Sequence, residues 1–489
     1  MKLNYKILLK IFGLITFIAG IAMIPCILVC RHYNEYDVAS KFIWPCIVLL
    51  VLGLCLVLSL KRYKKKLSIN DGYFIASMAW IYSTLLGTIP FILNGYSIID
   101  SIFESVSGFT TTGANVISLD ELSHGLIFWK AILNWAGGMG ILVLVVSVFP
   151  ALGISGQSIA SQETTGPTLQ KIGAKFSDTG KFLYITYISF TLVEFVLLCA
   201  LTPLGTFDSL VNSFSTISTS GIYMLNGDTT IYSSYSVRAI IMLFTILSSL
   251  NYTLFFLILN GKIKQVLRDT ELNVFLLIII ISTILISISL LINNMYSNAF
   301  QAISDSFLQV VSFISTSGYF ICDYNIWPTF SIIILFGLLF IGGCSMSTSG
   351  SLKVIRVITL FKLIKRGVIK QIHPRATKAI VVGGKAIPAK QVSSITSHII
   401  LYFIVLFSGI LLLSLNNLPM GQTITASLGM FTNTGVMLGE NEITGYIVNF
   451  TGFSKIIMSI LMIAGRLEMY SLLLLFTRSF WAKDSANIL

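Results

Sequence analysis

Apolar runs long enough to cross a bilayer recur along almost the whole chain. The first two lie at about residues 5–30 and 41–60, and a spanning helix needs about 20 apolar residues. Of the 489 residues, 55% are hydrophobic and only 11% are charged, whereas a soluble domain has about 25% charged residues. The sequence therefore predicts an all-α protein that crosses a membrane many times.

The net charge of +12 is unevenly distributed. Basic residues gather at 61–66 and 365–390, whereas 222–235 and 319–329 contain neither lysine nor arginine. Lysine and arginine accumulate in the cytoplasmic loops of membrane proteins. We therefore expect a multi-pass protein of the cytoplasmic (inner) membrane with both termini cytoplasmic. The orientation of the protein in the lipid bilayer explains why these loops are basic. We therefore expect no nucleic-acid partner.

Four short segments break the apolar pattern, and each contains a glycine preceded by a small hydroxyl or amide residue. They read FESVSGFTTTGAN at 103–115, VNSFSTISTSGIY at 211–223, LQVVSFISTSGYF at 308–320 and ASLGMFTNTGVML at 426–438. The glycines are Gly113, Gly221, Gly318 and Gly435, at intervals of 97 to 117 residues. Such intervals fit a repeated unit of two long helices with the short segment between them.

The stretch before each glycine is too short to span a bilayer. It has about 10–12 residues, or about 15–18 Å of helix, so it can enter the membrane and return. Units with two crossings and one re-entrant segment are parallel and can surround an axis. The predicted fold is thus an N-terminal helix hairpin plus four parallel helix–pore loop–helix repeats around a central pore. The predicted boundaries are 1–66 for the hairpin and basic loop, then 67–155, 156–265, 266–372 and 373–489 for the repeats.

The chemistry of the four segments favours a dehydrated monovalent cation. Backbone carbonyls arranged in rings replace the hydration shell of such an ion, and glycine permits the backbone angles that turn a carbonyl inward. No carboxylate lies beside the glycines, which disfavours a calcium site. The alternative is that small residues merely let helices pack closely.

Two further features are unusual for apolar spanning helices. GGCSMSTSGS at 342–351 interrupts an apolar helix of the third repeat, and residues this rich in glycine and serine break helices; a kink without a gating role is the alternative. Arg466 lies within the last apolar helix, where a charge is costly and typically functional. We expect Arg466 either to act as an electrostatic barrier to ion conduction or to form a structural salt bridge with Glu194. Glu194 itself is either a proton site or a structural carboxylate.

These repeats resemble the Trk/Ktr/HKT superfamily of potassium transporters, and the extra N-terminal hairpin resembles its bacterial TrkH branch. The resemblance extends to FWKAILNWAGGMGILVL at 128–144, QETTGPTLQKIGAKFSDTGKFLYITY at 162–187, GGCSMSTSGSLKVIR at 342–356 and AGRLEMYSLLLLF at 464–476. It implies a selectivity filter made of Thr111, Thr112, Gly113, Thr219, Ser220, Gly221, Thr316, Ser317, Gly318, Asn433, Thr434 and Gly435. Within it, K⁺ is expected at Thr112, Gly113, Ser220, Gly221, Ser317, Gly318, Thr434 and Gly435.

The resemblance also implies a gate and protein partners. The gating residues would be Gly342, Gly343, Cys344, Ser345, Met346, Ser347, Thr348, Ser349, Gly350 and Arg466. Met346 and Ser351 occupy positions where the family pattern has glycine, which predicts a stiffer or more obstructive loop. A homodimer and a cytosolic, nucleotide-binding regulatory subunit of the TrkA type are the implied partners.

The predicted function is potassium uptake across the cytoplasmic membrane, through a four-loop selectivity filter gated by the intramembrane loop. We expect no enzymatic activity and no covalently bound cofactor, with K⁺ as the transported ion. The alternatives are a Na⁺- or H⁺-coupled cation symporter and a less selective K⁺/Na⁺ pathway. A membrane enzyme would need a nucleophile–base set or a cluster of metal ligands, and the sequence pattern indicates neither.

Overall fold

The computed structural model describes residues 5–60, 69–143, 176–221, 234–320, 322–374, 379–438, 450–467 and 469–481. The basic cluster at 61–66, residues 162–175 and most of the loop at 222–235 lie outside the described residues. The positive-inside pattern of those segments therefore remains a prediction.

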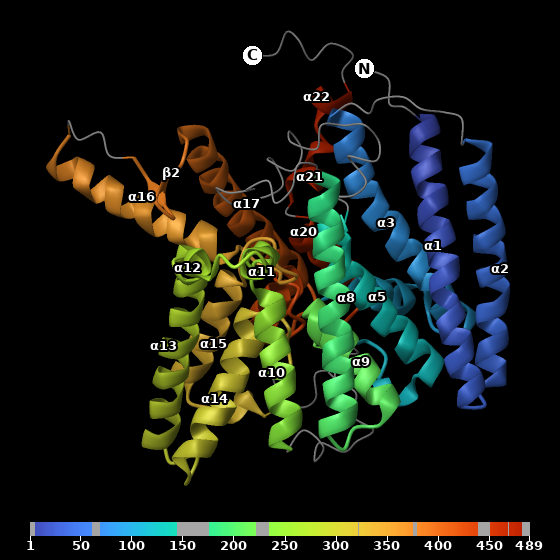
Figure 1. The fold of residues 1–489 in the computed structure, drawn as a ribbon, viewed down its shortest axis with the longest axis horizontal. Helices are drawn as coiled ribbons and strands as arrows, with labels where there is room; N and C mark the ends of the chain where they lie inside the picture. Colours follow the sequence, from blue (N-terminus) through green and yellow to red (C-terminus); the bar gives the residue numbers. More distant parts are fainter. Residues whose placement is uncertain are drawn as a thin grey trace.

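The described residues fold mainly into helices (Figure 1). In chain order the elements are α1 (Tyr5–His32), α2 (Tyr36–Ser59), α3 (Ile69–Leu93), α4 (Ile98–Phe109), η1 (Leu119–Glu121), α5 (His124–Val143), α8 (Phe176–Leu201), α9 (Thr206–Ser218), α10 (Tyr235–Ser249), α11 (Tyr252–Leu259), α12 (Ile263–Leu267), α13 (Thr270–Ile292), α14 (Ala299–Ile314), η4 (Tyr324–Ile326), α15 (Thr329–Ile341), α16 (Val354–Ile372), β1 (Val381–Val382), β2 (Lys385–Ala386), α17 (Ala389–Ser414), α18 (Met420–Phe431), α20 (Gly452–Arg466), α21 (Tyr470–Leu474) and α22 (Arg478–Trp481).

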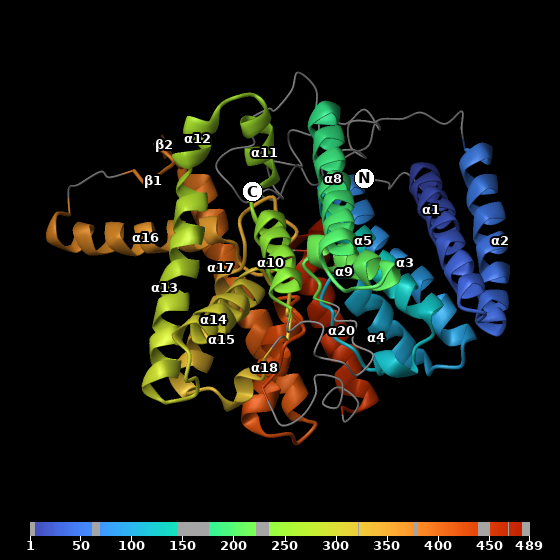
Figure 2. The same ribbon diagram turned by 60° about the horizontal axis from the view of Figure 1, so that its bottom comes forward.

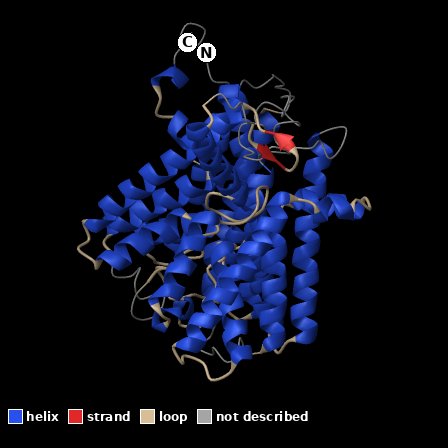
Figure 3. Ribbon diagram, turned by 90° about the vertical axis from the view of Figure 1, so that its left-hand side faces the viewer, coloured by secondary structure: helices blue, strands red, loops and turns tan. Residues whose placement is uncertain are grey.

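The expected all-α class is confirmed, since one two-stranded antiparallel hairpin, β1–β2, is the sheet among the described residues (Figure 3). Within the described part of the chain, six helices are long and apolar enough to cross a membrane, and a seventh span results if α10 and α11 are counted as one. Those two helices meet at an angle of 94°. These spans fit a multi-pass membrane protein.

The second long helix of the later units is broken more often than the sequence predicts. A break is predicted at 342–351, and α15 indeed ends at Ile341 while α16 begins at Val354. Helix α10 also stops after 15 residues and is followed by α11, and α20 stops after 15 residues and is followed by α21. In the second and fourth units, the helix after the glycine loop is therefore also divided into two pieces, which the sequence does not predict.

Helices α1 and α2 form the predicted N-terminal hairpin and lie side by side at one edge of the molecule (Figure 1). Small residues permit their close contact, because a Cβ on Gly53 would lie 2.5 Å from the backbone nitrogen of Phe17. The Glu35 carboxylate at the hairpin turn accepts hydrogen bonds from the backbone nitrogens of His124, at 2.9 Å, and Gly125, at 3.1 Å. This contact caps the start of α5 and joins the hairpin to the remainder of the fold.

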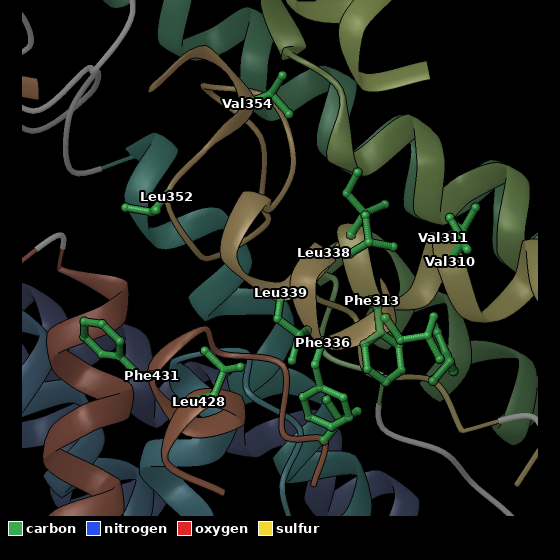
Figure 4. Close-up of a cluster of buried hydrophobic side chains, with 14 of the residues drawn as sticks. Val310, Val311, Phe313, Phe336, Leu338, Leu339, Leu352, Val354, Leu428 and Phe431 are labelled. Atoms are coloured by element: carbon green, nitrogen blue, oxygen red, sulfur yellow. The ribbon is translucent and has the colours of Figure 1, made fainter. Parts of the chain in front are cut away.

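The short helices α4, α9, α14 and α18 are grouped around the middle of the molecule (Figure 2). Each follows one of the long helices α3, α8, α13 and α17, in the order that the glycine segments predict. Their apolar sides join one large core. Figure 4 shows part of it, where Phe313 of α14 lies close to Phe336 of α15, with ring centroids 5.6 Å apart.

Two ion pairs connect elements that are distant in sequence. Asp100 at the start of α4 pairs with Lys455 of α20 at 2.6 Å, and Asp305 of α14 pairs with Arg238 of α10 at 2.7 Å. The first pair joins the beginning of the helical array to its end. It therefore helps to close the array on itself.

Candidate ion pathway

Each of the four short helices ends immediately before one of the predicted glycine loops. Helices α4, α9, α14 and α18 end at Phe109, Ser218, Ile314 and Phe431. Unsatisfied carbonyls concentrate negative partial charge at a helix C-terminus. All four negative ends therefore lie next to their loops, where they favour a cation.

The four loops have the same backbone conformation. The glycines have positive φ angles: 74° at Gly113, 59° at Gly221, 70° at Gly318 and 72° at Gly435. Residues with a side chain rarely adopt this conformation. The structure thus gives the physical reason for glycine at these four positions.

The four loops meet in a closed ring. A Cβ atom on Gly113, Gly221 or Gly318 would clash with the carbonyl oxygen of Ser220, Ser317 or Thr434, respectively, and a Cβ on Gly435 would lie 2.5 Å from the carbonyl oxygen of Thr112. Each glycine thus touches the residue that precedes the next glycine, and the last touches the first. The predicted filter residues therefore converge at one place from four separate parts of the chain.

Two residues before each glycine, a residue with a side chain also adopts a left-handed conformation. Thr111, Thr219, Thr316 and Asn433 have φ angles of 58°, 55°, 57° and 57°. For threonine, whose Cβ is branched, this conformation is uncommon and costly. The sequence does not reveal it, because threonine is an ordinary loop residue and carries no signal for positive φ.

In three of the four loops, a residue six positions before the glycine contacts the chain that leaves the loop. The hydroxyl of Ser107 donates to the carbonyl of Ala114 at 2.6 Å, and that of Ser312 donates to the carbonyl of Tyr319 at 3.0 Å. In the fourth loop Gly429 lies so close to the carbonyl of Val436 that a Cβ would not fit. A short hydrogen bond or close backbone packing therefore holds the return chain of the first, third and fourth loops, whereas Ser215 of the second loop pairs with the Ser220 hydroxyl at 3.2 Å.

The predicted gating segment, residues 342–351, contacts the filter loops and α10. The nitrogen of Cys344 donates to the carbonyl of Ser249 at 2.9 Å. The nitrogen of Gly350 donates to the Thr316 hydroxyl at 2.7 Å, and a Cβ on Gly350 would clash with the carbonyl of Thr432. The segment therefore packs directly against the left-handed turns of the third and fourth loops.

Met346 and Ser351 have φ angles of 57° and 65°. Both residues thus adopt the conformation that glycine adopts most easily. The prediction that they replace glycine is consistent with this backbone, and its consequence for gating stays a prediction.

Arg466 lies at the end of α20 and is 3% exposed. Its Nη1 atom donates to the carbonyl of Thr348 and its Nη2 atom donates to the carbonyl of Gly137 in α5. Its guanidinium also lies 5.9 Å from the centre of the Trp80 ring. The guanidinium therefore connects the gating segment to the first unit of the chain.

The salt bridge between Arg466 and Glu194, which is one of the two alternatives predicted for Arg466, does not form. Glu194 is fully buried in α8, beside the Thr216 hydroxyl, and neither of its oxygens makes a hydrogen bond of ordinary geometry to a described residue. Backbone carbonyls, rather than a carboxylate, accept the hydrogen bonds of the two Arg466 Nη atoms, and its Nε atom makes no hydrogen bond to a described residue. Glu468, the other acidic residue near Arg466 in sequence, lies outside the described residues.

Sequence reasoning missed the carboxylate that holds the gating segment. Glu271 of α13 accepts from the nitrogen and the hydroxyl of Ser345, at 2.7 and 2.6 Å, and from the nitrogen of Ile355 at 3.2 Å. One buried side chain thus fixes both ends of the segment. Glu271 and Ser345 are far apart in sequence, so no local motif marks the contact.

The comparisons with known proteins cover nearly the whole chain. A family model described as TrkH, cation transport protein, matches residues 38–483. The chain is 31% identical to the Trk system potassium uptake protein TrkH of Escherichia coli K12 and 32% identical to that of Vibrio parahaemolyticus, covering 98% of this chain and 100% of each relative. It also resembles the crystal structure of the potassium transporter TrkH from Vibrio parahaemolyticus, with a TM-score of 0.86 at 29% identity over 98% of this chain and 100% of that one.

Proposed function

The chain belongs to the TrkH family of cation transport proteins, and from this premise we propose that it takes up potassium ions through the ring of four glycine loops. The observation that carries the proposal is the closed set of contacts from Gly113 to Ser220, Gly221 to Ser317, Gly318 to Thr434 and Gly435 to Thr112. Loops that meet in this way can surround one ion with carbonyl oxygens. The relatives named above are themselves potassium uptake proteins.

The ligands in this proposal are backbone carbonyls at and before the four glycines. They belong to the pairs Thr112–Gly113, Ser220–Gly221, Ser317–Gly318 and Thr434–Gly435. One glycine per loop gives a short stack of carbonyl rings, so the filter holds few ions at a time. Helix ends aimed at the ring add negative potential without any carboxylate.

The gate in this proposal is the segment 342–350 together with Arg466. Its contacts with Thr316 and with the Thr432 carbonyl place it against the filter turns. A guanidinium held there repels a cation in the pathway. Conduction therefore requires that the segment and Arg466 move apart, which breaks the bond from Arg466 to Thr348.

We place the protein in the cytoplasmic membrane with both termini cytoplasmic. The lysines and arginines of 61–66 and 365–390 support this orientation through the positive-inside rule. The start of α1 and the last helix, α22, lie at the same end of the molecule (Figure 1). The four short helices then enter the membrane from outside.

A homodimer with a cytosolic regulatory subunit is the proposed assembly. Helix α16 extends from the body of the molecule (Figure 1) and exposes large apolar side chains at Phe361, Ile364, Val368 and Ile372. Such a row of exposed apolar residues supports an interface. The relatives are named as components of a Trk system, which supports a partner subunit of the TrkA type.

Growth at low potassium tests the function. The wild-type chain should restore growth to a bacterial strain that lacks potassium uptake, and Gly113→Ser should not, because its side chain would clash with the Ser220 carbonyl. The matched control is Gly337→Ala in α15, where an added Cβ meets nothing within 4 Å. Failure of the wild-type chain, when present in the membrane, would contradict the proposal.

A further inference from the structure

A buried ion pair lies behind the first glycine loop. The Lys130 ammonium of α5 donates to the Glu104 carboxylate of α4, and both side chains are completely buried. A buried pair is costly to desolvate unless further hydrogen bonds satisfy its remaining donors and acceptors. The partners of this pair therefore indicate what it holds in place.

Every further partner of the pair belongs to the four residues that follow Gly113. The Oε1 atom of Glu104 accepts from the nitrogens of Val116, at 2.6 Å, and Ile117, at 3.0 Å. Lys130 donates to the carbonyl of Ala114 at 3.2 Å and to the Asn115 side-chain oxygen. The pair thus binds the chain directly after the filter glycine, on its return from the ring.

The residue held by Lys130 also takes part in the contact that closes the ring. A Cβ on Gly435 would lie 2.5 Å from the carbonyl oxygen of Thr112 and 3.0 Å from the nitrogen of Ala114. A shift of Ala114 therefore moves the surface against which the fourth loop packs. The ion pair fixes that surface through two independent side chains from two helices.

The position nine residues before the glycine has different partners in the other loops. Gln309 donates to the carbonyl of Cys322 at a long 3.4 Å, Asn212 donates within its own helix to Asp208 at 2.8 Å, and Ala426 has no polar side-chain atom. Among the described residues, the first loop is the one whose return chain is held by an ion pair. The residues that follow Gly221 lie outside the described residues, so this comparison covers the first, third and fourth loops.

We infer that Glu104 and Lys130 are positioning residues that set ion selectivity, because they fix the first loop as the rigid reference against which the ring closes. This inference rests on the proposed function. Neither side chain contacts the ion; both act through the backbone of residues 114–117. Loosening that backbone lets the carbonyl ring adapt to Na⁺ as well as to Rb⁺ or K⁺.

The test is the ratio of Rb⁺ to Na⁺ uptake by purified protein in liposomes, normalised to the amount of folded protein. Glu104→Gln and Lys130→Met should each lower the ratio about fivefold, which corresponds to about 1 kcal/mol of discrimination. The matched control is Asp100→Asn, one turn earlier on α4, which breaks the ion pair with Lys455 but contacts none of residues 114–117 through a recorded bond. Its ratio should remain that of the wild type.

The two single substitutions distinguish a positioning role from a purely electrostatic role, because they change the charge behind the filter in opposite directions. Glu104→Gln leaves an extra positive charge behind the filter and Lys130→Met an extra negative one, so a purely electrostatic role predicts opposite shifts in apparent Rb⁺ affinity with an unchanged ratio. That result would overturn the inference. A wild-type protein without Rb⁺ uptake would instead overturn the proposed function.

Loss of one partner of a buried pair can prevent folding, so two gentler variants keep the test decisive. The double variant Glu104→Gln/Lys130→Met removes both charges, and Asn115→Ala removes one acceptor of Lys130 without a change of charge. Both should elute as folded protein in size-exclusion chromatography and should still show a lowered ratio. A wild-type ratio in both would refute the positioning role.

Discussion

The Nη1 atom of Arg466 donates a 2.6 Å hydrogen bond to the carbonyl oxygen of Thr348. Its Nη2 atom reaches the carbonyl of Gly137 in a different part of the fold, at 3.1 Å. The four loops follow one another around the ring in chain order, so the gating segment and α5 belong to opposite sides of it. The guanidinium therefore bridges the two sides.

Removal of this bridge should open the pathway. We expect Arg466→Ala to raise basal Rb⁺ flux about tenfold or more, because a positive charge about 6 Å from a cation costs it about 3 kcal/mol at an effective dielectric constant of about 20. Liposome flux measured without any regulatory subunit gives the comparison. Arg466→Lys distinguishes charge from geometry, since lysine keeps the charge but lacks the planar fork that reaches two carbonyls. A low flux in Arg466→Ala, with intact protein, would contradict the barrier.

The bond from Gly350 to Thr316 should hold the gating segment against the filter. Thr316→Val keeps the shape of the side chain but removes the acceptor at 2.7 Å. A hydrogen bond of this kind contributes about 1 kcal/mol, so basal flux should rise about fivefold. Thr219→Val is the matched control, because Thr219 has the same left-handed backbone but its hydroxyl donates to the adjacent Ser218 carbonyl. If Thr316→Val and Thr219→Val raise the basal flux equally, the rise comes from a change in the filter turn and not from loss of the contact with the gating segment.

Asn433 should strengthen the junction between the fourth and first loops. This junction has the widest of the four glycine approaches, and the Asn433 amide donates across it to the Thr112 hydroxyl at 3.1 Å and to the Met462 carbonyl at 2.8 Å. We expect Asn433→Thr, which installs the residue found in the other three loops, to lower the Rb⁺ to Na⁺ uptake ratio severalfold. An unchanged ratio in liposomes would rule out this role.

The Glu35 cap should stabilise the attachment of the N-terminal hairpin. Glu35→Ala removes the acceptor for two nitrogens at the start of α5, and loss of such a cap typically costs about 1 kcal/mol. The midpoint of thermal unfolding in detergent should fall by a few degrees while ion flux is retained. Asp37→Ala, which removes the exposed pair with Lys41, should leave the midpoint unchanged.

Features that depend on local composition could be predicted from the sequence. The hairpin expected at 5–30 and 41–60 corresponds to Tyr5–His32 and Tyr36–Ser59, because uninterrupted apolar length decides a spanning helix. The four glycines could be identified because each loop needs a positive φ at that point. The break after Ile341 could be predicted because glycine and serine are dense there.

Features that depend on distant partners could not be predicted. The break after Ser249 occurs without glycine or proline beside it, so tertiary contacts decide it. Gly465 lies next to the break after Arg466, but a single glycine within an apolar helix is not by itself a signal for a break. The contact of Glu271 with Ser345 and the pair of Glu104 with Lys130 join different helices. The small hairpin at 381–386 was missed although Gly383 and Gly384, both at positive φ, are a recognisable turn signal.

The contact between Gly435 and Thr112 has a consequence for how the protein is made. The ring lacks one side until the ribosome has synthesised the fourth loop, and Lys455, which ties the last helix to Asp100, emerges later still. A nascent chain threaded only partly into the membrane therefore has no complete ring of carbonyls. The pathway through the ring is thus assembled only after the fourth loop has joined the three loops made before it.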